Sequence, residues 1–378
     1  MAVDPWGFDR ERQAIARRLR TMRLRLSAAR SAVFVTVVSI LVFRGSGYLR
    51  DAVLSLRWPA WLSTILFLSV LFALFAAIEL PFGYIGGHRW ERACGLSSQT
   101  FLAWLKDVAK GFGLGLGASI VAGSVILWLL AAFPTWWWAV AWALGVVVSA
   151  VLGFLAPILL VPIFYRFRPL RDASLRSRFE SLAAKANVPI VGVFELNASE
   201  KTRRSNAAVM GFGRTRRVIV TDTLLQDFSP EEVETVLAHE LAHQKHLDPI
   251  RGFLQGSLVS FLVLAFAGWA YSIAFPSFGI RSPHDMAGLP LLAAVLAFVS
   301  LPFRPLELFT SRSREARADR FSLDLTRDPA SFAGAMVKLH DRNLGVADPG
   351  PWERWLFYSH PSGRDRVEMA RAFPILSA

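Results

Sequence analysis

Residues 111–165 read GFGLGLGASIVAGSVILWLLAAFPTWWWAVAWALGVVVSAVLGFLAPILLVPIFY, a run of 55 residues without a charged side chain. A helix needs about 20 consecutive apolar residues to cross the hydrocarbon core of a bilayer. The run is therefore long enough for two spanning helices, and Pro134 with Thr135 marks the turn between them. We predict that this stretch forms a helical hairpin within a membrane.

Uncharged runs of spanning length recur on both sides of this hairpin. Trp58–Ile78 has 21 such residues, 252–280 has 29 and 286–303 has 18. A weaker run of 13 residues, Ser31–Phe43, is bounded by arginines and can span only if their side chains snorkel to the headgroups. Counting this run, the sequence predicts six transmembrane helices.

The composition agrees with a membrane protein and excludes several other classes. Of 378 residues, 53% are hydrophobic and 19% are charged, against about 25% charged in soluble domains. Disordered and collagen-like chains are excluded, and the single cysteine excludes a disulfide scaffold. The net charge of +13 lies beside the spans, which indicates contact with a lipid bilayer and no nucleic-acid partner.

The basic segments also predict the orientation of the chain. The N-terminal 30 residues carry eight arginines and should therefore stay in the cytoplasm. Six spans place the other strongly basic segments on the same side, although the arginines that follow the first span argue against this. The chain then divides into a basic cytoplasmic N-terminus at 1–30, four spans within 31–165, a first protease segment at 166–251, two spans within 252–303 and a second protease segment at 304–378.

The first polar segment has the pattern of a small mixed domain. Residues 172–186 are predicted as an amphipathic helix, and 190–196, 206–210 and 217–221 as strands. Ser-Pro-Glu-Glu at 229–232 places Ser at the N-cap, Pro at the first helical position and Glu where a capping box needs it. The helix begun there should run to about residue 246. The second polar segment is predicted to be mainly helical.

That last helix carries the motif His239-Glu240-Leu-Ala-His243. Residues four apart lie on the same helical face, so the two imidazoles can bind one Zn²⁺. Glu240 then lies beside the ion, where its carboxylate can take a proton from water. The spacing therefore predicts a zinc hydrolase site.

A hydrolytic zinc site needs a third protein ligand, for which two candidates remain open. His246 lies seven residues beyond His239, about 10 Å along a straight helix, which is far for one ion. Glu315 and Asp319 lie four apart on another predicted helix, so that one can ligate and the other can orient a ligand histidine. We favour Glu315 as the ligand.

These motifs, taken in order, resemble the type 1 CAAX prenyl protease family. The resemblance rests on the histidine motif, the two spans after it and the Glu-x-x-Ala-Asp sequence at 315–319. It extends upstream to Leu-Pro-Phe-Gly-Tyr at 80–84 and downstream to Ser-His-Pro at 359–361, and covers roughly residues 58–370. Ala242 stands where the family often has glycine, and the chain has one predicted span fewer.

The resemblance implies a fold and a set of residue roles. The fold is an all-α polytopic membrane protein of about six transmembrane helices, with an inserted α+β zinc protease domain of the gluzincin type. One Zn²⁺ per chain would be held by His239, His243 and Glu315, and Asp319 would orient a ligand histidine. The remaining implied roles are Glu240 as general base, His360 as stabiliser of the oxyanion, and Asn206, Ala207 and Arg366 as substrate-binding residues.

Three functions follow as hypotheses. The first is an endopeptidase that cleaves the C-terminal tails of prenylated or other membrane-bound proteins. The second is a quality-control protease for membrane proteins, which shares all of this chemistry. The third, a six-span transporter, is disfavoured because no charge lies within the predicted spans. We expect an integral membrane protein, in the inner membrane if bacterial, with its active site on the cytoplasmic side.

Overall fold

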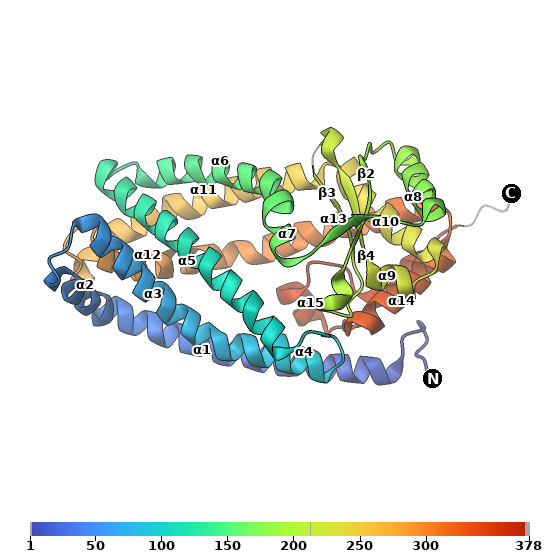
Figure 1. Ribbon diagram of the computed structural model, residues 1–378, viewed down its shortest axis with the longest axis horizontal. Helices are drawn as coiled ribbons and strands as arrows, with labels where there is room; N and C mark the ends of the chain where they lie inside the picture. Colours follow the sequence, from blue (N-terminus) through green and yellow to red (C-terminus); the bar gives the residue numbers. More distant parts are fainter. Residues whose placement is uncertain (1, 212, 375–378) are drawn as a thin grey trace.

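The computed structural model describes residues 2–211 and 213–374. Long helices fill one end of the elongated molecule, and a small sheet with shorter helices fills the other (Figure 1). Within the described residues, six helical segments are long and apolar enough to cross a membrane, as the sequence predicted. Helices α3 (Ala60–Gly83), α5 (Phe101–Ala132), α6 (Trp137–Leu159) and α11 (Asp248–Ala274) form four of them.

The first span is longer than its 13 uncharged residues indicate. Helix α1 (Arg10–Ile40) continues through a π-helical turn, Leu41–Gly45, into α2 (Ser46–Ser55). Arg30, at the start of the apolar run, bonds Glu79 of α3 through Nε at 2.7 Å. The helix thus extends beyond the uncharged run on both sides, and one flanking arginine, Arg30, pairs with an acidic residue.

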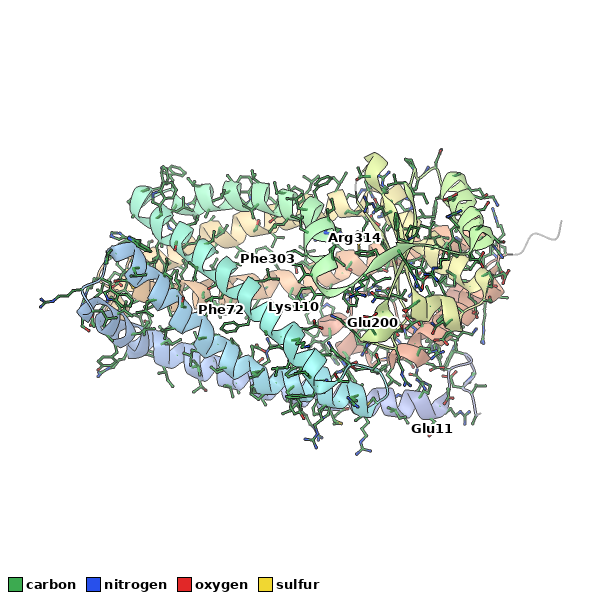
Figure 2. All side chains as sticks on the ribbon, viewed as in Figure 1. Glu11, Phe72, Lys110, Glu200, Phe303 and Arg314 are labelled. Atoms are coloured by element: carbon green, nitrogen blue, oxygen red, sulfur yellow. The ribbon has the colours of Figure 1, made fainter. Side chains whose placement is uncertain are left out.

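The last span leads directly into the other end of the molecule. Helix α12 (Leu289–Ser300) passes through a 3₁₀ turn, Leu301–Phe303, into α13 (Arg304–Thr326). Figure 2 shows Phe303 among the spanning helices and Arg314 beside the sheet, and both lie on one continuous helical segment. The last spanning helix therefore continues directly into the helix that carries Glu315.

The sheet has four short strands in the order β1-β2-β4-β3. The two central strands, β2 (Gly192–Leu196) and β4 (Arg217–Thr221), are parallel. β1 (Phe167–Pro169) pairs antiparallel with β2, and β3 (Ala207–Met210) pairs antiparallel with β4. β3, which the sequence predicted as a strand, is therefore an edge strand, whereas β1 was not predicted.

Short helices cover this sheet and complete the domain. They are α8 (Ala173–Lys185), α9 (Asp222–Asp227), α10 (Pro230–Lys245), α14 (Pro329–Asn343), α15 (Pro351–Phe357) and α16 (Gly363–Arg371). The single turns α4 (Trp90–Ala93) and α7 (Val161–Phe164) end the second and fourth spanning segments. The sheet shares one core with α8, α9, α10, α14 and α16, and this core includes the fully buried Phe179, Leu237 and Phe332.

The N-terminal segment is part of that core. Phe8 is completely buried in it, although residues 1–30 were predicted only as a basic segment. Gln13 Nε2 donates to Asp341 Oδ1 at 2.9 Å, and Gln13 Oε1 accepts the Ala347 N–H at 2.9 Å. Glu11 lies at this end of α1, beneath the small domain (Figure 2). The N-terminus and the small domain therefore lie at the same end of the molecule (Figure 1).

Candidate metal centre

Helix α10 begins and ends as its sequence dictates. Ser229 and Glu232 form a complete capping box, and Pro230 occupies the first helical position. The helix ends before Leu247, whose backbone adopts a left-handed conformation with φ of 55°. The helix therefore extends past both motif histidines, His239 and His243. Their Nε2 atoms lie 3.3 Å apart on one face.

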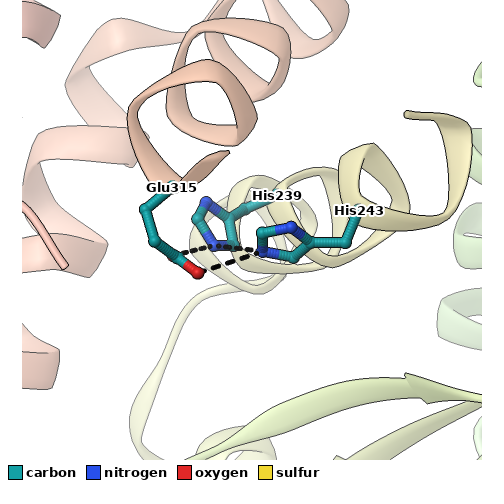
Figure 3. A group of neighbouring side chains, drawn as sticks. All are labelled: His239, His243 and Glu315. Carbon is teal, nitrogen blue, oxygen red and sulfur yellow. Dashed lines mark hydrogen bonds and ion pairs between the residues drawn. The ribbon is translucent and has the colours of Figure 1, made fainter. Parts of the chain in front are cut away.

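Helix α13 brings Glu315 to the same place. Its Oε2 lies 3.1 Å from His239 Nε2, and its Oε1 lies 3.5 Å from His243 Nε2 (Figure 3). The ligand atoms of the three residues all lie within 4.8 Å of one another. The structure thus brings together the two histidines and the favoured third residue from helices about 70 residues apart.

The side-chain hydrogen bonds of the two histidines suit the binding of a metal ion. The Nδ1 atom of His239 bonds a carboxylate, and so does that of His243, so each ring in its neutral form presents the lone pair of Nε2 to the centre. Glu315 Oε2 is buried, with the Nε2 atoms of His239 and His360 at 3.1 Å and 3.3 Å. Two imidazole lone pairs and a carboxylate facing one point are the donor set of a divalent cation such as zinc.

A carboxylate behind each histidine fixes its ring. Asp319 Oδ1 lies 2.8 Å from His239 Nδ1, as the sequence led us to expect of this residue. Asp248 Oδ2 lies 3.0 Å from His243 Nδ1 in the same way, and Arg317 pairs with Asp248. Asp248 was not predicted, although it follows the motif closely at the start of α11.

Arg366 lies behind His239. Its guanidinium is 8% exposed and pairs with Asp319, with Nε 2.9 Å from Asp319 Oδ2. Its Nη2 lies 3.4 Å from His239 Nδ1. Arg366 therefore pairs with the carboxylate that orients a histidine, and it also lines the neighbouring pocket.

Glu240 and His360 border the centre on its open side. Burial raises the pKa of the Glu240 carboxyl above its ordinary value, which suits a group that must accept a proton and release it. His360 Nε2 lies 3.3 Å from Glu315 Oε2, and its Nδ1 lies 2.8 Å from Ser359 Oγ. Both side chains line one pocket of about 280 Å³ next to His239.

Ser205 and Asn206, which directly precede the edge strand β3, line the same pocket. The Asn206 carbonyl accepts the Thr221 N–H, so the backbone groups of Ala207, one residue on, point away from the sheet. The Ala207 N–H donates to the side chain of Asn206 at 3.0 Å. The carbonyl of a bound peptide can replace the Asn206 side chain as the acceptor of this outward N–H.

Two further histidines have well-defined positions in the structure. His246 caps α10 and packs edge-on against Phe321, outside the metal group. His340, to which the sequence analysis assigned no role, lines the pocket together with Ser205 and Asn343. No motif marks these three residues, since only the packing of α14 and of β3, which follows Ser205, against α10 brings them to the site.

Comparisons with known proteins agree with this arrangement. The model of peptidase family M48 matches residues 169–373, and a model described as the CAAX prenyl protease N-terminal region with five membrane helices matches residues 8–166. In this chain that second region contains four candidate spans, so one helix is missing relative to the description.

Individual relatives cover most of the chain. A Bacillus subtilis protein titled uncharacterized metalloprotease YhfN is 30% identical over 82% of this chain and 74% of its own. A CAAX prenyl protease 1 homologue of Oryza sativa is 31% identical over 81% of this chain and 72% of its own. The crystal structure of S. mikatae Ste24p superposes with a TM-score of 0.85 at 21% identity, covering 97% of this chain and 90% of that one.

Proposed function

This chain belongs to peptidase family M48 and is an integral membrane metallopeptidase, and we propose that it is a zinc endopeptidase that cleaves the C-terminal tails of lipid-modified proteins. The observation that carries the proposal is the group formed by His239, His243 and Glu315. Two imidazole nitrogens and one carboxylate meet there, on helices of which one, α13, continues directly from the last spanning segment.

The proposed metal is zinc, one ion per chain. Two imidazole nitrogens and one carboxylate, with a position left for water, form a typical catalytic zinc site. When bound, zinc lowers the pKa of water and polarises the carbonyl of the peptide bond. His239 and His243 would supply the nitrogen ligands and Glu315 the oxygen ligand.

The side chains beside the ion would move the protons. Glu240 would take a proton from the attacking water and give it to the leaving amine, a role that its raised pKa favours. His360, whose side chain is 56% exposed beside Glu315, would donate a hydrogen bond to the oxygen on which negative charge develops.

The peptide would bind as an additional strand. β3 is the edge of the sheet, and the outward backbone of Ala207 is available for main-chain pairing once the Asn206 side chain yields. Such pairing holds the peptide in an extended conformation across α10. It also accepts many sequences, so attachment to the membrane would restrict the choice of substrate.

The position of the site supports a membrane-attached substrate. Two helices border the metal group: α11 is itself a spanning helix, and α13 continues from the last spanning segment. A lipid chain in the bilayer would hold a protein tail close to this end of the bundle, and a prenyl group agrees with the names of several relatives.

The charge distribution supports a cytoplasmic active site. The loops at the end of the bundle far from the sheet contain four arginines and two aspartates, which gives +2 of the chain's net +13. One of these arginines, Arg50, is buried and pairs with Asp285. Most of the basic excess therefore lies at the end with the metal group, which the positive-inside rule places in the cytoplasm.

A cleavage assay tests the proposed function. The purified full-length protein, loaded with zinc, is given two otherwise identical peptides, one farnesylated and one unmodified. We expect kcat/KM to be about tenfold or more higher for the farnesylated peptide, and a chelator to abolish cleavage until zinc is restored. Equal cleavage of both peptides would contradict lipid selection and would favour a quality-control protease.

Labelling of introduced cysteines tests the sidedness. After replacement of Cys94, single cysteines at the exposed positions Ser27, Ser177 and Ser55 are treated with an impermeant maleimide in intact cells. We expect only the Ser55 position to react from outside. Reaction of the Ser177 position in intact cells would contradict the proposed orientation.

A further inference from the structure

The pocket beside the metal group contains polar atoms that the proposed mechanism does not use. Besides His239, Glu240 and His360, its wall includes Ser205, His340 and Asn343. Apolar side chains, among them Val236 and Met336, form the rest of the wall. The pocket of about 280 Å³ is large enough for one side chain of a bound peptide.

We propose that Ser205 and His340 select an uncharged, hydrogen-bonding side chain of the substrate, such as that of serine, threonine, asparagine or glutamine. The proposal rests on the proposed peptidase function and assigns these two residues as determinants of its specificity. Their place beside Glu240 puts the selected side chain next to the bond that is cut.

Ser205 offers a hydroxyl that nothing in the described part of the chain engages. The residue is 3% exposed, and its Oγ has no hydrogen-bond partner there. Its backbone is held firmly, because the Ser205 N–H donates to Asn343 Oδ1 at 3.1 Å and the Ser205 carbonyl accepts from Asn343 Nδ2 at 3.2 Å. A buried hydroxyl without a partner is costly, so a ligand that bonds it gains affinity.

His340 offers an acceptor in a fixed position. Its Nδ1 lies 2.9 Å from the Met336 carbonyl and must donate to it, which leaves the lone pair on Nε2. The ring lies against two glycines. A Cβ at Gly363 would lie 2.8 Å from Nε2, and one at Gly345 would lie 3.3 Å from Cδ2. Burial lowers the pKa of His340 to about 4, so the ring is neutral at physiological pH.

The charged groups near the pocket do not favour a charged substrate side chain. Arg366 is paired with Asp319. Arg204 pairs with Glu91 and donates to the Asn343 carbonyl. An acidic side chain would therefore lack a free cation and face the Glu240 carboxylate, while a basic one would pair with Glu240 and withdraw it from its role as base. A hydroxyl or amide avoids both costs and can both donate and accept.

The direction of β3 indicates which residue enters the pocket. The pocket lies at the start of the strand, beside Ser205 and Asn206. A peptide that pairs antiparallel with β3, the more stable direction, runs from Met210 towards Ala207. Its residues near Ser205 therefore follow the cut bond, and we place the selected side chain there.

The test measures selectivity as a ratio. The zinc-loaded full-length protein is assayed with fluorogenic peptides that differ only at the residue after the cut bond, which is serine, glutamine, alanine, aspartate or lysine. We expect kcat/KM for serine and glutamine to exceed that for alanine by about 3- to 10-fold, and aspartate and lysine to be cleaved more slowly than alanine. Ser205→Ala should bring the serine-to-alanine ratio close to one, and His340→Leu should reduce it. The exposed Ser27→Ala should keep both the ratio and the rate of the wild type.

The outcomes separate the pocket from the overall function. Cleavage with an alanine preference in the wild type would overturn the selection. An equal loss for all peptides in Ser205→Ala would show a structural role and would also overturn it. If the zinc-loaded wild type cleaves none of the peptides, lipidated versions included, the proposed function itself fails.

Discussion

Asp248 and Asp319 should each strengthen metal binding through one histidine, and Asp→Asn substitutions separate this role from a purely structural one. Each carboxylate accepts the Nδ1 proton of its histidine, at 3.0 Å for His243 and 2.8 Å for His239. Asparagine keeps the size and removes the charge that makes the imidazole a stronger ligand. Loss of such a partner costs about 10- to 100-fold in metal affinity.

The two substitutions should differ in their effect on stability. Asp319 is fully buried and neutralises the buried Arg366, so Asp319→Asn leaves an unpaired buried cation and should cost about 3–5 kcal/mol. The partner of Asp248 is Arg317, whose side chain is 38% exposed and can turn to solvent. Asp248→Asn should therefore weaken metal binding with a loss of stability of only about 1 kcal/mol.

Zinc affinity is measured by competition with a chromogenic chelator, and stability by thermal unfolding of the metal-free protein. Asp324→Asn is the matched control, because Asp324 lies on α13 at the surface and pairs only with Arg320. We expect both quantities to be unchanged in the control. Wild-type zinc affinity in Asp248→Asn would refute the idea that this carboxylate orients a metal ligand.

Three further predictions follow from the structure. In the metal-free protein, burial alone would lower the pKa of His239, but its bond with Asp319 raises this pKa to about 9. Zinc must displace the proton, so zinc affinity should rise about tenfold per pH unit from pH 6.5 to 8.5. The metal-free protein should lose stability between pH 6.5 and 9, as the same proton is released. A pH-independent affinity would contradict this. Ala207→Pro removes the outward N–H and should lower kcat/KM about tenfold or more at constant zinc content, and unchanged turnover would mean that the peptide binds elsewhere. Phe8→Ala should cost about 3–5 kcal/mol in denaturant unfolding, because Phe8 is fully buried against α14, whereas Phe298→Ala, with 76% of that residue exposed, should cost far less.

The sequence specified the elements whose signals are local. The capping residues 229–232, the period of the helix that follows and the spacing of its two histidines all lie within 20 residues, and α10 forms as predicted. The same holds for the spanning helices, whose length and lack of charge are direct consequences of the bilayer.

Features that depend on tertiary contacts were not visible in the sequence. β1 has only three residues and exists because β2 offers it an edge. Phe8 reaches a core that consists mostly of residues more than 150 positions away, which no local pattern records. The position of His340 in the pocket was not predicted, because a single histidine on a helix does not reveal what packs against it.

The candidate site also had parts that the sequence predicted and parts that it did not. His239, Glu240 and His243 followed from their spacing, whereas Glu315 and Asp319 were favoured by spacing and then supported by the family resemblance. Asp248 was missed because it lies in the first turn of a helix, where acidic residues are common through their favourable interaction with the helix dipole. Nothing in its local sequence indicates a second role.

The central claim is that Glu315 holds the metal and Glu240 moves the proton, and zinc content measured beside cleavage rate tests it most directly. Purified Glu240→Gln should keep about one equivalent of zinc while cleavage falls by about 10²- to 10⁴-fold. Glu315→Gln should lose zinc and activity together, with partial recovery in excess zinc, and the exposed Glu180→Gln should behave as wild type. Full zinc in Glu315→Gln, or undiminished cleavage by Glu240→Gln, would contradict the account.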